Sequence, residues 1–530
     1  MKSLFSCNFV IYTLFSECFI SILTIMITET AFIPAVQSLT TASGWVSSRA
    51  GEIVCESALE QTALLAKEQL SRAGLSCNVH LSNDFQCSQG SLCIRLQKDA
   101  YVEHEEGYEL SINDQGVLIK ARTEAGLYYG IQSLRQLVYS CDGRYPYLTI
   151  KDYPSFSWRG IMIDTSRTFY PVDFLKKMID AASFHKLNRF HWHLTDDQGW
   201  RLPVDGYEKL TEKGAYRKDP RYSWGEKTGG YYTKADITSV VTYAAQHHMM
   251  VVPEIETPGH ASAILASYPE LGCTGGPYEV EYRYGIFDEV LCAGNDEVFT
   301  MLGKVFDTVC ELFPSPYVHI GGDECPRTRW KSCPKCQDRM KKENLSSEDE
   351  LQSWITVKVS KMLEERGKIA VGWDEVLDGT ERLGLPKSLV VQSWRGMESG
   401  KRASALGHKV IMSPQTAGCY LDHKPYDDPS EPGMHKIATV KDSYSYSPVT
   451  DDMSREQSSC VLGGQGNLWT EVVYASKIAE YMIFPRLCAI SESLWLEKDK
   501  KDFVSFAKRL FTHKKRLDAM NILYYRGKLD

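Results

Sequence analysis

Two adjacent carboxylates, Asp323 and Glu324, end the short apolar run VHIGGDE. A buried strand that stops at a glycine pair and then presents charge is typical of a parallel barrel strand where it meets its catalytic loop. Neighbouring side chains on a strand diverge, so we expect the two acids to play different roles. The alternative is a structural pair of strand-end acids. The glycines, which let a ligand approach the backbone, favour a reactive site.

Hydrolysis of a glycosidic bond suits such a pair. One carboxylic acid must protonate the leaving oxygen, and Glu324 is the better candidate, because burial and a neighbouring like charge are expected to raise its pKa. A retaining glycosidase normally holds its two carboxyl groups roughly 5 Å apart, on opposite sides of one anomeric carbon. Two adjacent residues fit this arrangement poorly. We therefore expect a 2-acetamido group of the substrate to supply the nucleophile, with Asp323 accepting its amide N–H.

A second cluster, HWHLTDD at 191–197, places two histidines on one face of a predicted strand. Metal-dependent barrel hydrolases also use such a pair, and His260 and Asp323 could complete a ligand set, so this is the main competing hypothesis. The intervening tryptophan and the aromatic-rich remainder of the chain favour sugar binding instead. We predict no metal ligand and no cofactor. Either histidine could also be a core residue bonded to a backbone carbonyl.

Three tryptophans, Trp373, Trp394 and Trp469, each follow a different predicted strand. At one level of a barrel they could wall a pocket around a sugar ring and an acetamido methyl, and Tyr420 could donate a hydrogen bond to the acetamido oxygen. Charged side chains could hold the ring hydroxyls. The candidates for that role are Arg167, Asp422 and Glu471. A non-catalytic sugar-binding protein would use the same wall but lack an acid, and no acid is missing here.

The elements that must position these residues repeat after residue 154. Apolar strands alternate with helical stretches, which predicts an α/β fold with a TIM-type barrel as the catalytic domain, preceded by a small α/β domain. The eight predicted strands are 160–164, 189–194, 250–255, 317–321, 369–372, 389–392, 410–412 and 461–466. Because the carboxyl ends of barrel strands share one face, the polar and aromatic residues that follow them should converge.

The predicted organisation has four segments. Residues 1–37 form a signal peptide or signal anchor, 45–150 the small α/β domain, 154–500 the barrel and 501–530 a C-terminal helical extension. Within the small domain we predict helices at 57–73 and 123–137 and strands at 92–96 and 116–119, with 147–154 as the link to the barrel. A basic helix is expected at 503–517.

Bulk composition narrows the function classes. The chain has 530 residues, 43% hydrophobic content and a net charge of −8. These values predict a large core and argue against a nucleic-acid partner. Lys2 and the apolar stretch that follows predict export, to a secreted, periplasmic or lysosomal location, with a membrane as partner only if the segment stays uncleaved. The sequence allows a homodimer.

Sixteen cysteines leave their pairing open. Cys273 and Cys292 flank a loop rich in glycine and tyrosine, so a disulfide that closes this loop is expected. Cys333 and Cys336 form a CxxC with Cys325 nearby, but a second CxxC or a histidine partner at finger spacing is missing. We expect a disulfide or free thiols there in preference to structural zinc.

At these motifs the chain resembles glycoside hydrolase family 20, the β-N-acetylhexosaminidases, over roughly residues 45–500. The matching motifs are RGIMIDTSR (159–167), HWHLTDDQ (191–198), PEIETPGH (253–260), HIGGDE (319–324), WDE (373–375), YLD (420–422) and NLWTE (467–471). The tract CPRTRWKSCPKC resembles bacterial, Bacteroidetes-like members. The resemblance implies removal of terminal, non-reducing β-linked N-acetylglucosamine or N-acetylgalactosamine from a glycan or glycoconjugate, with retention and through an oxazolinium intermediate.

The resemblance also implies residue roles. Glu324 would be the general acid/base, and Asp323 would orient and stabilise the acetamido nucleophile. Asp196 and His260 would belong to the polar network around the acids, with His193 and Glu256 in support, although Glu256 replaces an aspartate common in the family. The remaining site residues would bind the sugar: Arg167, Trp373, Trp394, Tyr420, Asp422, Trp469 and Glu471.

Overall fold

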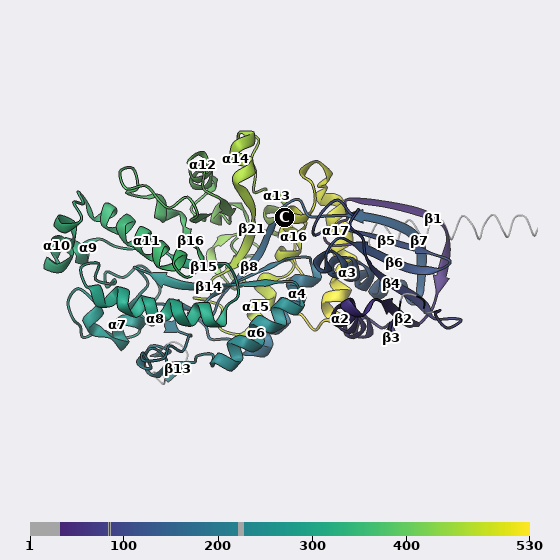
Figure 1. The fold of residues 1–530 in the computed structure, drawn as a ribbon, viewed down its shortest axis with the longest axis horizontal. Helices are drawn as coiled ribbons and strands as arrows, with labels where there is room; N and C mark the ends of the chain where they lie inside the picture. The colour runs from purple at the N-terminus through teal and green to yellow at the C-terminus, as the bar shows by residue number, and fades with distance from the viewer. Residues whose placement is uncertain (1–31, 83, 85, 221–226) are drawn as a thin grey trace, which may run out of the picture. The chain divides into compact units, whose positions relative to one another are not determined.

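The computed structural model describes residues 32–530 except 83, 85 and 221–226. The predicted signal or anchor segment therefore lies almost entirely outside the described residues. The chain forms two compact units, and the described residues of the first are 32–155, without 83 and 85, together with 184–186 and 491–523. The second unit comprises 156–183, 187–490 and 524–530 (Figure 1). Within the described residues, no helix is both long and apolar enough to cross a bilayer.

The first unit is a seven-stranded mixed sheet with helices packed against it. Its strand order is β1-β7-β5-β6-β4-β2-β3. The strands are β1 (Ser38–Ser47), β2 (Ala50–Cys55), β3 (Ser76–Leu81), β4 (Leu92–Lys98), β5 (Tyr108–Asn113), β6 (Gly116–Ala121) and β7 (Arg144–Asp152). The helices α2 (Glu60–Arg72), α3 (Glu124–Cys141) and α17 (Phe503–Ala519) belong to the same unit. Apolar side chains of α2, α3 and the strands form one core cluster.

The segment predicted as a link is a strand of this sheet. β7 pairs antiparallel with β1 on one side and with β5 on the other. Its alternation buries Leu148, Ile150 and Asp152, whereas the sequence had predicted a connection at 147–154. Pro146 lies opposite Trp45 beside an irregularity in the β1 pairing, and outside the part of β7 that pairs with β5, which is where a sheet tolerates proline.

The second unit contains a closed barrel of eight parallel strands, as predicted. All eight strands coincide with predicted segments to within two residues at either end. They are β8 (Trp158–Asp164), β9 (Arg189–His193), β14 (Met250–Thr257), β15 (Tyr317–Gly321), β16 (Ile369–Trp373), β17 (Val390–Ser393), β18 (Val410–Met412) and β21 (Val461–Leu468). The last strand pairs with the first and closes the barrel.

Helices follow most barrel strands, in the order expected for this fold. The principal ones are α4 (Val172–Phe184), α6 (Lys234–Gln246), α8 (Asp296–Leu312), α11 (Glu348–Glu364), α12 (Met397–Ala405), α14 (Arg455–Cys460), α15 (Ser476–Ile483) and α16 (Arg486–Trp495). One connection differs, because β16 leads to β17 through the short 3-10 turn η3 (Asp374–Leu377). Val376 and Leu377 are buried there, so the turn covers its part of the barrel in place of a helix.

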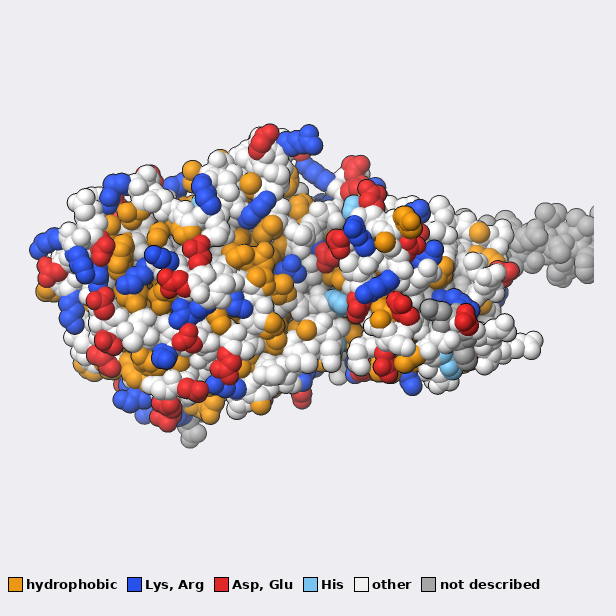
Figure 2. All heavy atoms as spheres, viewed as in Figure 1, with side chains coloured by type: hydrophobic (Ala, Val, Ile, Leu, Met, Phe, Trp, Pro, Cys, Tyr) orange, Lys and Arg blue, Asp and Glu red, His pale blue; other side chains and the backbone are white. Residues whose placement is uncertain are grey.

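The barrel interior is layered along its axis. Apolar side chains, including Trp158 and Val390 at the first positions of β8 and β17, form a cluster near the amino ends of the strands. Buried histidines and acids come next, on β9, β14 and β15. The functional residues follow at the carboxyl ends. Outside the barrel, Lys/Arg and Asp/Glu side chains are intermixed over the face shown in Figure 2.

Candidate active site

The backbone leaves β15 through three residues with positive φ. Gly321 (φ 67°), Gly322 (φ 101°) and Glu324 (φ 46°) turn the chain immediately after the strand ends. A Cβ on Gly321 would lie 1.8 Å from an oxygen of Glu256, and one on Gly322 would lie 2.9 Å from Val376. The turn and the close side-chain packing thus both require glycine at these positions.

The turn directs both carboxylates at one imidazole. His260 Nε2 lies 3.6 Å from Asp323 Oδ2 and 3.6 Å from Glu324 Oε2. Because the strand has already ended, the divergence of neighbouring strand side chains does not apply to these residues. Asp323 is buried, and the Glu324 side chain is 34% exposed. The two acids therefore share a partner but differ in their access to solvent.

His260 is held by acids on its other side. Its Nδ1 lies 2.9 Å from Asp197 Oδ2 and 3.3 Å from Asp196 Oδ1. Burial opposes charge on the ring, but the Asp196 charge and the hydrogen bonds that Nδ1 donates to the neighbouring carboxylates outweigh it and raise the pKa of His260 well above its usual value. A cationic His260 stabilises the carboxylates that it faces.

Glu254 organises the layer below. Its carboxylate lies within hydrogen-bonding distance of His191, His193 and His319 and accepts a 2.8 Å bond from Trp373 Nε1. Burial disfavours its charge, but the three imidazoles hold the pKa of Glu254 well below its usual range. The two histidines of β9 thus face a buried acid. This accounts for the spacing that had suggested a metal hydrolase.

Asp196 joins this layer to a buried arginine. Its Oδ2 lies 2.9 Å from His193 Nε2 and 2.8 Å from an amino nitrogen of Arg167. Arg167 also donates to Gln198 and lies 3.9 Å from Glu471. Its guanidinium lies 5.1 Å from the centroid of the Trp469 ring, within cation–π range. These contacts fix the guanidinium at the wall of a cavity.

The cavity has a volume of about 330 Å³ and opens at the carboxyl ends of the strands. This volume is at the lower end of the range for small-molecule sites and suits a single sugar ring. The lining residues are Arg167, His260, Asp323, Glu324, Trp373, Trp394, Gln415, Tyr420, Asp422, His423, Met434, His435, Lys436, Trp469 and Glu471.

Aromatic rings form the cavity wall in two pairs. Trp373 and Trp469 have ring centroids 5.7 Å apart, and Trp394 and Tyr420 stack at 6.4 Å with an interplanar angle of 19°. Trp394 is anchored by a 2.9 Å bond from its Nε1 to Glu375. The rings are therefore fixed before any ligand arrives, which lowers the entropic cost of binding.

Several buried oxygens around the cavity have no hydrogen-bond partner among the described residues. They include Asp323 Oδ1, Asp422 Oδ1 and Glu471 Oε2. Burial raises the pKa of Asp422 to about 8, reinforced by the Glu471 charge, and burial likewise raises the pKa of Asp323 to about 6 although the His260 charge opposes it. Such groups would gain hydrogen bonds from a ligand with hydroxyl and amide donors.

Family models match both units of the chain. The model of glycosyl hydrolase family 20, domain 2, matches residues 29–153, and the model of the family 20 catalytic domain matches 156–498. The chain belongs to glycosyl hydrolase family 20. The resemblance seen in the sequence motifs is thereby confirmed.

Family 20 relatives align over most of the chain. The beta-hexosaminidase of Porphyromonas gingivalis is 39% identical over 485 residues, which cover 89% of this chain and 61% of that protein. This chain therefore spans less than two thirds of that relative. The Cellulomonas fimi beta-N-acetylhexosaminidase is 31% identical, with coverage of 92% of this chain and 94% of the relative.

Solved family 20 structures share the fold. The Vibrio harveyi exo beta-N-acetylglucosaminidase in complex with N-acetylglucosamine superimposes with a TM-score of 0.84 at 28% identity, covering 94% of this chain and 78% of that one. A mutant Streptomyces plicatus beta-hexosaminidase in complex with product (GlcNAc) gives 0.81 at 29% identity, covering 94% and 97%.

The structure brings most of the residues predicted from sequence to the family 20 cavity. The exceptions among them are Asp196, His193 and Glu256, which lie buried behind the wall. Glu256 packs beneath Gly321, and burial, together with the Asp323 charge, raises its pKa well above its usual value. A neutral Glu256 would avoid adding a further charge beside Asp323.

Sequence reasoning missed two groups of residues. Glu254 and His319 form the buried layer, and both lie in family motifs at inward-facing strand positions, so strand alternation was the available signal. The other group lines the cavity from the β18–β21 connection: Gln415, His423, Met434, His435 and Lys436. No motif marks these five positions, although the YLD motif (420–422) lies in the same connection, because the course of the loop around that motif depends on tertiary packing.

Proposed function

We propose that the protein is an exo-acting β-N-acetylhexosaminidase that removes terminal, non-reducing β-linked N-acetylglucosamine or N-acetylgalactosamine from a glycan. The observation that carries the proposal is the pair of acids facing His260 at an aromatic cavity, with Asp323 Oδ1 unpaired among the described residues. The cavity volume favours exo action because it suits one ring. The names of the family 20 relatives support the same activity.

The proposed mechanism divides the work between the two acids. Glu324, the more exposed, donates a proton to the leaving oxygen and later removes one from the attacking water. Asp323, as a carboxylate, accepts the N–H of the 2-acetamido group, whose carbonyl oxygen attacks C1 and forms an oxazolinium. Cationic His260 lies 3.6 Å from Asp323 Oδ2, so its charge favours the ionised form of Asp323 that this role requires.

The remaining wall residues are assigned to binding. The aromatic pairs would enclose the ring and the acetamido methyl, and Tyr420 would donate to the acetamido oxygen. Arg167, Asp422 and Glu471 would hold the ring hydroxyls, using the buried oxygens that have no partner among the described residues. Export remains part of the proposal on the sequence of residues 1–37 alone.

Paired aryl glycosides test the proposal. An aryl β-N-acetylglucosaminide and the matching β-glucoside differ only at the 2-position, so substrate assistance predicts turnover of the first and essentially none of the second. A thiazoline-type inhibitor, which has the shape of the cyclised intermediate, should bind much more tightly than product. Equal turnover of the two glycosides would sink the acetamido mechanism, and turnover of neither would sink the proposed activity.

A further inference from the structure

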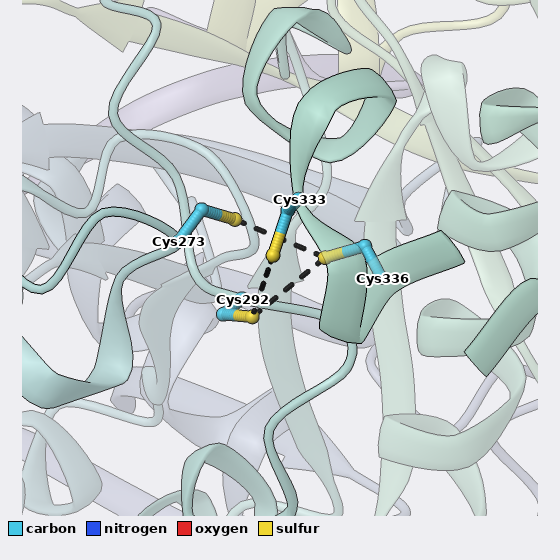
Figure 3. Close-up of side chains that lie close together, drawn as sticks. All are labelled: Cys273, Cys292, Cys333 and Cys336. Atoms are coloured by element: carbon cyan, nitrogen blue, oxygen red, sulfur yellow. Dashed lines mark hydrogen bonds between the residues drawn. The ribbon is translucent and has the colours of Figure 1, made fainter. Parts of the chain in front are cut away.

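Four cysteines from separate parts of the second unit meet beside the barrel. Figure 3 shows their thiols directed at one point. They are Cys273 and Cys292, both within the long β14–α8 connection, and Cys333 and Cys336, which follow α9 (Thr328–Ser332) and lie at the start of α10 (Pro334–Lys342). None forms a disulfide, in contrast to Cys87 and Cys93 in the first unit.

The spacing of the sulfurs is that of a tetrahedral site. The Sγ–Sγ distances are 3.8 Å for Cys273–Cys336, 3.7 Å for Cys292–Cys333 and 3.7 Å for Cys292–Cys336. All four sulfurs lie within 4.8 Å of one another. Zinc–thiolate bonds of about 2.3 Å in tetrahedral geometry place sulfurs about 3.8 Å apart. Disulfide pairing would favour one partner for each cysteine, whereas Cys292 is equally close to two.

The surrounding backbone is built for this approach. A Cβ on Gly294 would lie 2.1 Å from the carbonyl carbon and oxygen of Lys335, so only glycine lets the Cys292 loop reach the start of α10. Cys292, Cys333 and Cys336 are buried.

We propose that Cys273, Cys292, Cys333 and Cys336 bind one structural Zn²⁺. The four thiols lose four protons on binding, and the ion keeps its charge, so the site forms without an oxidant or reductant. Four protein ligands leave no open position, which makes the role structural. The expected Cys273–Cys292 disulfide is not formed, whereas Cys333 and Cys336 are free thiols, which is one of the two expected states of that pair.

The site would join two barrel loops that flank the acids. One is the connection after β14, where the Glu281 N–H donates to the Asp197 carbonyl and Gln198 donates to the Arg283 carbonyl. The other starts at Glu324 and runs to Cys336. None of the four cysteines lines the cavity. The ion would therefore hold Glu324 and the loop beside Asp197 in place and take no part in the bond cleavage.

Metal analysis of the full chain tests the site. The protein, purified without chelator or reductant, should contain close to one zinc per chain by inductively coupled plasma mass spectrometry. X-ray absorption spectroscopy at the zinc edge should show about four sulfur ligands at about 2.3 Å. Titration with a mercurial reagent should release this zinc as the thiols react. These two measurements use the unmodified protein, so they do not depend on the folding of a variant.

Variants locate the ligands. Cys336→Ser should lose the zinc and lower the thermal midpoint. Cys310→Ser, a change at a free cysteine outside the cluster, should keep both. When zinc is removed, activity should fall in proportion to the fraction of protein that unfolds. Protein in which another metal replaces zinc should keep the same substrate preference. A protein that lacks zinc, that binds iron in its place, or whose intact mass shows disulfides among these four cysteines overturns the proposal.

Discussion

Asp323 and Glu324 are neighbours with different surroundings. Both face His260 at 3.6 Å, but only Glu324 retains substantial exposure, at 34%. An acid that exchanges protons with a leaving group and with water needs that access, whereas a residue that holds an amide benefits from burial. The difference comes from the positive φ of Glu324, which turns its side chain out of the strand direction.

Glu324→Gln should separate leaving-group chemistry from binding. Loss of the proton donor should slow hydrolysis of glycosides with poor leaving groups by about 10²- to 10⁴-fold. Glycosides with an activated dinitrophenyl leaving group should be much less affected in the step that forms the oxazolinium, and inhibitor affinity should change little. Steady-state kinetics on both substrates measure this. Glu365→Gln, an exposed change outside the cavity, should leave both rates unchanged, and normal activity of Glu324→Gln would remove Glu324 as the acid.

The pH dependence of kcat/KM should report the protonation of Asp323. Burial raises the pKa of this group to about 6 against the opposing charge of His260, so Asp323 becomes protonated as the pH falls through that value. A protonated Asp323 cannot stabilise the positive charge that develops on the acetamido group. We therefore expect kcat/KM for an activated aryl N-acetylglucosaminide to fall about tenfold per pH unit below about pH 6.

Asp323→Asn provides the matched control for that profile. Its residual activity should be low and should lack the acidic limb near pH 6. A wild-type profile that stays flat to pH 4.5, or an unchanged limb in the variant, would assign the titration to another group.

Residue types and their order along the chain predict most of the site. The acids, Arg167 and the tryptophans stand at the carboxyl ends of predicted strands, and strand ends must meet in a barrel. Glu254 was not predicted as a site residue, because its role depends on contacts with side chains of β9, β15 and β16. Only the closed barrel brings these strands together. The loop at 415–436 is similarly defined by tertiary packing.

At the scale of elements, the end of β15 depends on its glycine pair. Gly321 has a positive φ, and the Glu256 carboxylate occupies the space that a Cβ at this position would need. An L-residue there would suffer backbone strain and a steric clash at once. Either effect would move the two acids that follow.

Gly321→Ala should therefore be more damaging than an alanine at another glycine of similar φ. Gly367 has φ 71° and open space around its Cβ position, so Gly367→Ala should cost about 1 kcal/mol of stability and leave kcat unchanged. Gly321→Ala should cost about 2–5 kcal/mol and reduce kcat, because overpacking adds to the strain. Denaturant unfolding and kinetics of the two variants measure this. Equal effects would show that the Glu256 contact is unimportant.

Strand prediction succeeded in the barrel for a physical reason. Its strands are buried on both faces and read as apolar runs with clear boundaries. The same reasoning missed β7, which it predicted as the link to the barrel, and it did not foresee that η3 would replace a helix after β16. In both cases the residues are buried by neighbouring elements, and the local sequence does not predict that burial.

At the scale of the molecule, the first unit is discontinuous in sequence. Residues 491–523 return to it after the barrel, although the sequence had suggested a separate C-terminal extension from 501. Trp495 belongs to the core cluster of the unit and donates a 2.9 Å bond to Asp152, which also pairs with Lys186 at 2.7 Å. The unit is therefore incomplete until the end of the chain has been synthesised.

Arg509 on α17 tests that dependence. It makes a two-pronged ion pair with buried Glu492 at 2.6 and 2.7 Å and donates to the Phe32 carbonyl. Arg509→Met should cost about 3–5 kcal/mol, because it removes the two-pronged partner of a buried carboxylate. Lys508→Met, an exposed change on the same helix, should stay within about 0.5 kcal/mol. Adding Glu492→Gln to Arg509→Met should recover part of the loss. If the thermal midpoints of the two methionine variants coincide, α17 does not stabilise the first unit.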